Sequence, residues 1–300
     1  MEILRRLYAP AYRGAIKNAL LRGGPVRGQL LSLRRAGAMI RSIFRSLSRR
    51  FLRLAFFAAT SIAAEAAPCP GNPDALGTER VLAVDAATTP QVGYKHFATT
   101  LPLARKEVVL TFDDGPWPGP TDRVLDALRH ECVRATFFLL GRNAASHPKL
   151  VRREAAEGHT VAHHSFSHPV LARLSFGAAE ADIDRGIAAV ETAVSGRTGL
   201  YPVTPFFRFP GFASSPALLD RLKQRGIVVF GADLWASDWN PMTPPDELAL
   251  VMSRLNVTGG GILLFHDTKA QTAAMLPAFL RELKRNGYRV VHVVPAATIY

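Results

Sequence analysis

The chain has 300 residues, of which 48% are hydrophobic and 20% charged, a composition typical of globular proteins that excludes disordered and fibrous classes. Its 37 Lys and Arg residues exceed its 24 Asp and Glu residues and give a net charge of +13. Thirteen of the basic but only two of the acidic residues lie in residues 1–66, so that segment carries +11 and residues 67–300 carry +2. The charge therefore gives no support for nucleic acid as a partner of the rest of the chain.

Residues 1–66 have the pattern of an export signal. An apolar run of 11 residues, 54–64, follows an arginine-rich stretch and is short compared with the roughly 20 residues that span a bilayer. The small residues of Ala64-Glu65-Ala66 come next, as at a signal-peptidase site. We expect a basic leader with a cleaved signal peptide and an exported protein that is periplasmic, secreted or associated with the cell envelope; an uncleaved membrane anchor is the alternative. The basic region is unusually long, which favours Met39 as the true start.

Residues 67–104 are rich in Pro, Ala, Thr and Gly, show no sustained periodicity and are interpreted as an extended lead-in. They contain Cys69, and the other cysteine of the chain is Cys132. In an oxidising compartment the two could form one disulfide. Two unrelated thiols are the alternative, and the spacing favours neither.

From residue 105 onward, short apolar runs alternate with amphipathic stretches. The predicted strands are 108–112, 135–140, 160–164, 206–209, 227–232, 262–265 and 289–293. The predicted helices are 121–128, 148–156, 177–192, 216–225, 245–255 and 272–285. This alternation predicts a parallel α/β domain, open or closed into a barrel.

Polar residues gather where the predicted strands end, which is the edge at which parallel α/β folds build their sites. Asp113 and Asp114 precede a Gly-Pro bend, and a solvent-exposed turn without a function is the alternative interpretation of these residues. His164 and His168 are spaced so that two imidazoles meet on one turn, with His163 as a competitor at the loop entry. Two histidines with one carboxylate are a common metal set, and a buried histidine pair is the alternative.

Arg208 lies in an apolar strand and needs a partner if buried, for which Asp113 is the natural candidate; an outward-facing arginine is the alternative. His266 ends another strand, where a general acid could act, with Asp238 available to orient it. Trp235 and Trp239 could line a sugar-binding groove or simply belong to the core.

Five motifs in this order resemble those of the polysaccharide deacetylase family: Thr111-Phe-Asp-Asp-Gly-Pro116, His164-Ser-x-x-His168, Arg208-x-Pro210, Asp238-Trp239 and Leu263-x-x-His266-Asp267. The resemblance covers about residues 105–296. It implies a single catalytic domain, residues 105–300, with a distorted (β/α)7 barrel fold. The family includes chitin, chitooligosaccharide and peptidoglycan deacetylases and some acetylxylan esterases.

The resemblance also implies a role for each site residue. Asp114, His164 and His168 would bind a divalent metal, usually zinc, with cobalt or another divalent ion as alternatives. The other implied roles are a base (Asp113) paired with Arg208, a general acid (His266) oriented by Asp238, an oxyanion donor (the Gly211 N–H) and groove contacts (Trp235 and Trp239). Two departures affect substrate contacts: Gly211 follows Pro210 directly, and Trp235 stands where the family often has an acidic residue.

The expected activity is metal-dependent hydrolysis of acetyl groups from N-acetylated sugars of a polysaccharide or oligosaccharide, with an acetylated glycan as substrate, by a monomer. An O-acetyl esterase of xylan type would use the same site. A glycoside hydrolase with two carboxylates would leave the histidine pair unexplained. A carbohydrate-binding protein with a dead site is the remaining alternative.

Overall fold

The computed structural model describes residues 69–197 and 202–296. The predicted leader, residues 1–66, and the alternative start at Met39 lie outside the described residues. Within the described ranges, no helix combines the length and the apolar character needed to cross a membrane.

All pairings between described strands are parallel. The central strand β3 pairs with β4 on one side and β9 on the other, and β10 joins it near its start. The strands are β3 (Glu107–Asp113), β4 (Thr136–Leu139), β5 (Thr160–His163), β6 (Phe206–Phe207), β7 (Val228–Phe230), β8 (Leu234–Trp235), β9 (Gly261–His266) and β10 (Arg289–Pro295). All seven predicted strands are present, and the predicted α/β class with a distorted barrel is confirmed.

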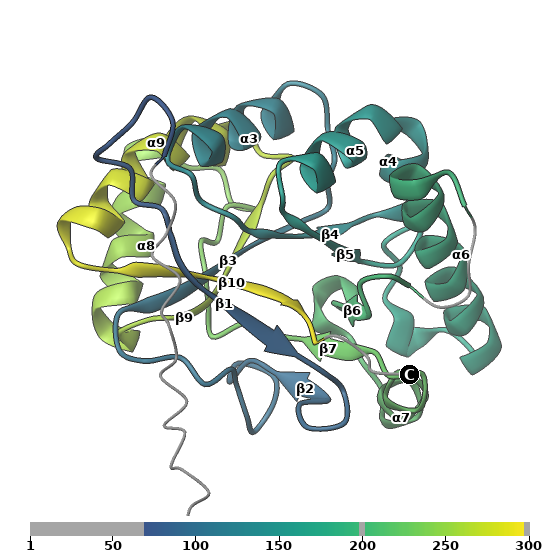
Figure 1. Cartoon of the computed structure of the whole chain (residues 1–300). Coiled ribbons are helices and arrows are strands. Elements are labelled where there is room, and N and C mark those ends of the chain that lie inside the picture. The colour runs from purple at the N-terminus through teal and green to yellow at the C-terminus, as the bar shows by residue number, and fades with distance from the viewer. Residues whose placement is uncertain (1–68, 198–201, 297–300) are drawn as a thin grey trace, which may run out of the picture. The chain divides into compact units, whose positions relative to one another are not determined.

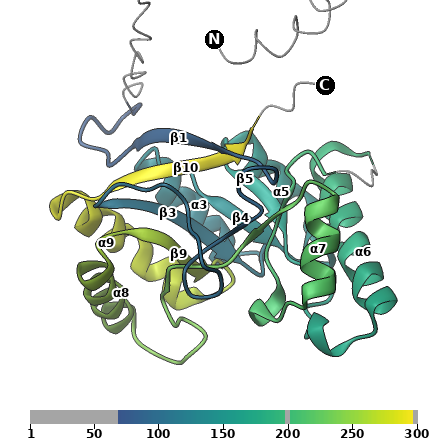
Figure 2. The ribbon, with the colours of Figure 1, turned by 90° about the horizontal axis from the view of Figure 1, so that it is seen from below.

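The lead-in is part of the sheet. It contributes β1 (Thr78–Val84), which pairs with β10, and β2 (Gln91–Val92), which pairs with β7. β1 lies outermost, beside β10 (Figure 2). A disulfide joins Cys69 to Cys132, with 5.7 Å between the two Cα atoms, so the start of the lead-in is tied to the loop after α3.

Helices cover the sheet, with α8 and α9 on one side and α6 and α7 on the opposite side (Figure 1). They are α3 (Pro120–His130), α4 (Gly141–Ser146), α5 (Pro148–Ala156), α6 (Phe176–Ser195), α7 (Pro216–Gln224), α8 (Pro244–Thr258) and α9 (Ala270–Arg285). Side chains of Ser175, Ser215 and Thr243 cap α6, α7 and α8 by accepting a backbone N–H of the first turn. The six predicted helices are confirmed, and α4 was not predicted.

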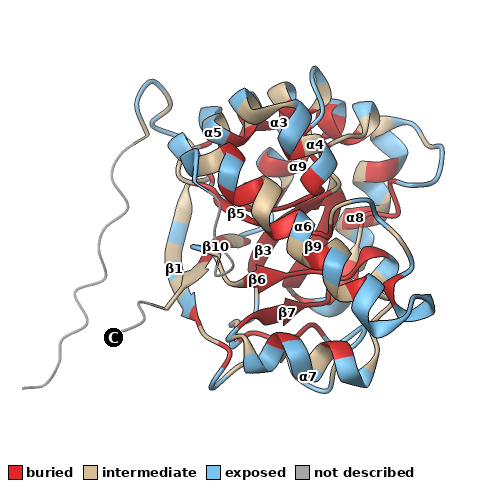
Figure 3. Cartoon of the chain, turned by 90° about the vertical axis from the view of Figure 1, so that its right-hand side faces the viewer, coloured by how far each residue is buried: buried red, intermediate tan, exposed pale blue. Residues whose placement is uncertain are grey.

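The strands β3 to β7 are buried on both faces, whereas β1 at the edge is partly exposed and the outer faces of the helices are exposed (Figure 3). Along β3, Val108, Leu110 and Phe112 belong to the core under the helices, and Val109 belongs to the core inside the barrel. Because side chains alternate along a strand, Asp113 shares the inward face of Val109. This alternation directs its carboxylate into the barrel at the carboxyl end of the strand.

Candidate active site

Asp113 and Arg208 form a buried ion pair inside the barrel. Arg208 Nη1 lies 2.6 Å from Asp113 Oδ1 and also donates to Thr111 Oγ1 at 2.9 Å. Its Nη2 donates to the carbonyl oxygen of Gly231 at 2.8 Å, and the guanidinium lies over the ring of Phe138. The prediction that Asp113 partners a buried Arg208 agrees with this geometry, and the outward-facing alternative is excluded, because Arg208 has no exposed surface.

Burial raises the pKa of the Asp113 carboxyl, and the neighbouring Arg208 guanidinium opposes that rise. The ion pair occupies Oδ1, whereas Oδ2 lies 3.7 Å from His164 Nε2. One carboxylate oxygen is therefore held in place while the other is directed towards the histidine pair.

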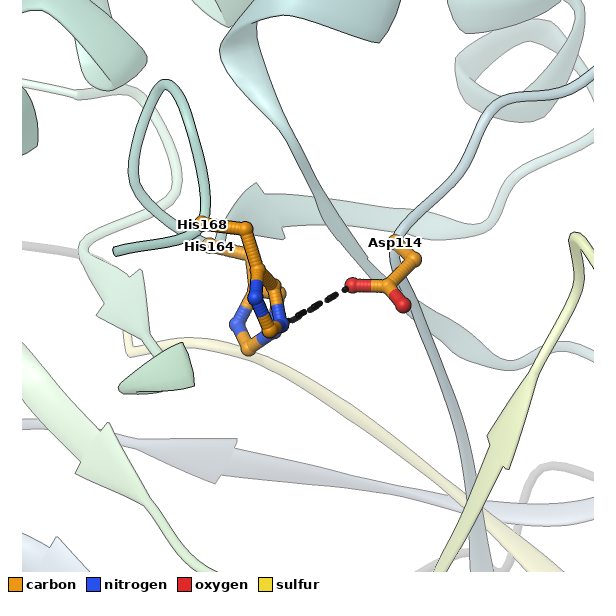
Figure 4. Close-up of side chains that lie close together, drawn as sticks. All are labelled: Asp114, His164 and His168. Carbon is orange, nitrogen blue, oxygen red and sulfur yellow. Dashed lines mark ion pairs between the residues drawn. The ribbon is translucent and has the colours of Figure 1, made fainter. Parts of the chain in front are cut away.

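Asp114, His164 and His168 lie together at the same edge, with both imidazoles next to the carboxylate (Figure 4). Asp114 Oδ1 is 3.6 Å from His164 Nε2 and 3.4 Å from His168 Nε2. One ligand atom from each residue lies within 4.8 Å of the other two. The backbone turns at Asp114, whose φ is +73°. Asp113 can therefore pair with Arg208 while Asp114 lies beside the two histidines.

The donor set fits a divalent cation. Asp114 Oδ1 is buried and has no hydrogen-bond partner, a costly state that a cation would relieve. His164 donates its Nδ1 proton to the carbonyl oxygen of Arg208 at 2.7 Å, which leaves Nε2 as the ligand atom. Burial lowers the pKa of His164 to about 3, so its imidazole is in the neutral form that binds metals.

The competing histidine, His163, is directed elsewhere. It is buried at the end of β5, and its Nε2 lies 3.4 Å from Glu191 Oε1 of α6. Adjacent residues of a strand face opposite sides, so the register of β5 sends His164 to the site and His163 towards α6.

The loop that carries His168 is held by a residue that the sequence did not single out. Asp182 of α6 accepts the backbone N–H of Phe166 at 3.0 Å and the hydroxyl of Ser167 at 2.6 Å. Ser165 Oγ accepts the N–H of His168, whose φ is +62°. The helix can approach this loop only at a glycine, because a Cβ on Gly186 would lie 2.4 Å from the carbonyl carbon of Ser165. No pattern around Asp182 marks it, since the contact spans two elements.

His266 and Asp238 form the second polar pair of the site. His266 Nδ1 donates to Asp238 Oδ1 at 2.8 Å, and Asp238 Oδ2 accepts the His266 backbone N–H at 2.7 Å. Burial disfavours the imidazolium, but the hydrogen bond and charge of Asp238, with Asp113 and Asp114, outweigh it and raise the pKa of His266 to about 9. His266 Nε2 lies 3.9 Å from Asp114 Oδ2, so the free nitrogen faces the Asp114 carboxylate.

The two tryptophans predicted as groove contacts, Trp235 and Trp239, form a chain of ring contacts to His266. The Trp239 ring lies 6.0 Å from the His266 ring and is 48% exposed, and the Trp235 ring lies 6.0 Å from that of Trp239. Neither tryptophan is a fully buried core residue. Gly211 lies in the short helix η2 (Pro210–Phe212) with a φ of +55°, shortly after Arg208.

Comparisons with known proteins find a family model, sequence relatives and solved structures that are similar to this chain. The family model described as polysaccharide deacetylase matches residues 101–230. The peptidoglycan-N-acetylglucosamine deacetylase PgdA of Listeria monocytogenes is 35% identical over 188 residues, which are 63% of this chain and 38% of that protein. A chitooligosaccharide deacetylase of a Bradyrhizobium species is 30% identical over 205 residues, which are 63% of this chain and 90% of the relative.

Among solved structures, a peptidoglycan deacetylase of Bdellovibrio bacteriovorus is similar with a TM-score of 0.64 and 34% identity, over 73% of this chain and 59% of that one. The match to the Listeria protein described above spans well under half of that protein's length.

Proposed function

The chain belongs to the polysaccharide deacetylase family, and from this premise we propose that it hydrolyses the acetamido group of N-acetylated sugars in a glycan, releasing acetate and a free amine. The proposal rests on two polar pairs, Asp113–Arg208 and Asp238–His266, that both lie next to Asp114. Asp113 and His266 supply the base and the acid that amide hydrolysis requires.

We assign the cation to Asp114, His164 and His168 and propose zinc, because two imidazole nitrogens and one carboxylate oxygen are ligands that it favours. When bound, such an ion polarises a carbonyl group and lowers the pKa of water.

Asp113 takes the proton of the attacking water. Arg208 holds Oδ1, so Oδ2 receives the proton on the side that faces His164. Burial raises the pKa of the Asp113 carboxyl, which makes the carboxylate more basic than in water, and the Arg208 guanidinium opposes that rise. The oxygen of water then bonds to the acetyl carbon, and negative charge develops on the former carbonyl oxygen.

His266 protonates the leaving nitrogen. Its Nδ1–H is engaged by Asp238, so the transferable proton is on Nε2, the nitrogen that faces Asp114. With a pKa of about 9 the imidazolium is the main form at neutral pH, which an amine leaving group requires. The carbon–nitrogen bond breaks as nitrogen takes this proton. We propose that the Gly211 N–H donates to the developing oxyanion and that Trp239 and Trp235 contact the sugar.

The experiment is an acetate assay on N-acetylated peptidoglycan glycan, chitooligosaccharides and acetylated xylan, with product lengths measured by mass spectrometry. We expect acetate from the N-acetylated substrates, no shortening of the chains, loss of activity after metal removal and recovery on adding zinc. Chain scission without acetate would instead support a glycoside hydrolase, and acetate from xylan alone would support an O-acetyl esterase. The Asp113→Asn variant is the control for a contaminating activity.

We also propose that the protein is exported and that cleavage after Ala66 leaves a mature chain beginning near Ala67. The leader pattern, the disulfide between Cys69 and Cys132 and the cell-wall substrates named for its relatives support this. The intact mass of the exported protein tests it, and a mature species that retains Arg41 would exclude cleavage at this position.

A further inference from the structure

A segment of the lead-in, residues 93–97, contacts the residues that follow β7. Lys95 donates its backbone N–H to the carbonyl oxygen of Ala232 at 3.0 Å, and Tyr94 donates its own to Asp233 Oδ1 at 2.8 Å. Gly93 allows this approach: its φ is +113°, and a Cβ there would lie 2.5 Å from the nitrogen of Ala232. The family model begins only at residue 101, so this segment is outside the matched region.

The segment adds to a row of rings that leads to the general acid. Its His96 ring stacks on Phe212 with 3.7 Å between centroids, and Phe212 lies 6.4 Å from Trp235. From Trp235 the row continues through Trp239 to His266. The Lys95 ammonium lies 5.3 Å from the centroid of Trp235, so a positive charge lies one ring away from Trp239.

This charge is available to a ligand. The Lys95 side chain is exposed and forms no ion pair with any residue that the structure describes. The nearby Asp233 carboxylate is buried and already accepts hydrogen bonds from Tyr94, Thr100 and Ile262. Burial, with the charges of Arg208 and Lys95, lowers the pKa of His96 to about 4, so the neighbouring imidazole is neutral.

We propose that Lys95 and Trp235 form a subsite for a carboxylate carried by the sugar next to the one that loses its acetyl group. Trp235 contacts the sugar, and the ammonium that lies over its ring pairs with the carboxylate. Chitin-like chains are neutral, whereas every second sugar of peptidoglycan bears a lactyl ether whose carboxyl is free or linked to a peptide with carboxylates of its own. The subsite therefore selects carboxylate-bearing glycans. This inference rests on the proposed function and narrows its substrate class.

The test compares kcat/KM on three oligosaccharides of equal length: peptide-free peptidoglycan glycan, the same glycan with its peptides, and a neutral chitooligosaccharide. Lys95→Ala should lower kcat/KM about tenfold on the carboxylate-bearing substrates, through KM, and change it less than about twofold on the neutral one. Lys95→Arg should retain the preference, and added salt should reduce it in the wild type because ions screen an exposed charge. A loss with the peptide-free glycan identifies the lactyl carboxylate as the ligand, and a loss confined to the peptide-bearing glycan identifies the peptide.

Lys223→Ala is the matched control. Lys223 is exposed near the end of α7, and α7 runs opposite to the parallel strands, so this residue lies towards the other edge of the sheet. An equal loss on charged and neutral substrates in Lys95→Ala, or no loss on either, overturns the inference even if acetate is released.

Binding measured by calorimetry on the Asp113→Asn variant, with and without Lys95→Ala, tests the subsite independently of turnover. A Lys95-dependent affinity for carboxylate-bearing glycans without any acetate release by the wild type would support the subsite and reject the proposed reaction.

Discussion

The Nδ1 of His164 lies 2.7 Å from the carbonyl oxygen of Arg208, the residue whose guanidinium holds Asp113. One residue thus orients two neighbours in different ways. Its backbone carbonyl accepts the Nδ1 proton of His164 and leaves Nε2 free, and its side chain holds Oδ1 of the buried Asp113 carboxyl. A single residue therefore links His164 to Asp113.

Arg208→Met should destabilise the fold by about 3–5 kcal/mol, because it leaves the Asp113 charge buried without its cation. Chemical denaturation measures the free energy of unfolding. The double variant Arg208→Met/Asp113→Asn removes both charges and should recover much of that loss. Equal stability of the single and double variants would contradict a role for the buried charge.

His168→Ala and His266→Ala should both abolish turnover, for separable reasons. The first variant loses a metal ligand and should contain less zinc per chain. The second should keep its zinc while kcat falls by roughly 10²–10⁴, the range for a general acid. Metal content measured beside kcat distinguishes them. Zinc loss in His266→Ala, or full occupancy in His168→Ala, would reverse the assignment of ligand and acid.

Asp182→Ala should weaken metal retention although Asp182 is not in the metal-binding group, because the loop that positions His168 loses its anchor. We expect the affinity for zinc to fall roughly 10- to 100-fold, as for other residues that orient metal ligands. Zinc should therefore dissociate faster into a chelator. Asp184→Ala is the control on the same helix, since Asp184 pairs with Arg225 instead. Equal effects of the two substitutions would indicate general damage to α6.

The pH profile of kcat/KM should fall at its alkaline end. His266 holds its proton below its pKa of about 9 and loses it above, and only the protonated form serves as an acid. A bound cation would move this alkaline limb of the profile to lower pH. The wild type is therefore compared with the Asp238→Asn variant at equal metal content. Removing the carboxylate that stabilises the imidazolium should shift the limb further towards lower pH. An unchanged limb would show that His266 does not control it.

Unreduced, denatured protein should contain no free thiols, because Cys69 and Cys132 are joined. The bridge closes a segment with a sequence separation of 63 residues, so the Cys69→Ser/Cys132→Ser variant should lose about 2–4 kcal/mol of unfolding free energy. Activity should change little, since neither cysteine belongs to the site. Two titratable thiols in the unreduced protein would reject the bridge.

The periodicity and motifs of the sequence determined the seven main strands, six helices and the polar residues at their ends, because burial repeats every two residues in a strand and every three to four in a helix. The two-residue strands β2 and β8 are too short for such a pattern and form only because the parallel neighbours β7 and β9 supply their hydrogen bonds. Tertiary structure alone decided that His164 rather than His163 faces Asp114, since one step of register exchanges the two. It also brought Asp182 under the His168 loop and Lys95 over Trp235, contacts between segments whose local sequences carry no sign of each other.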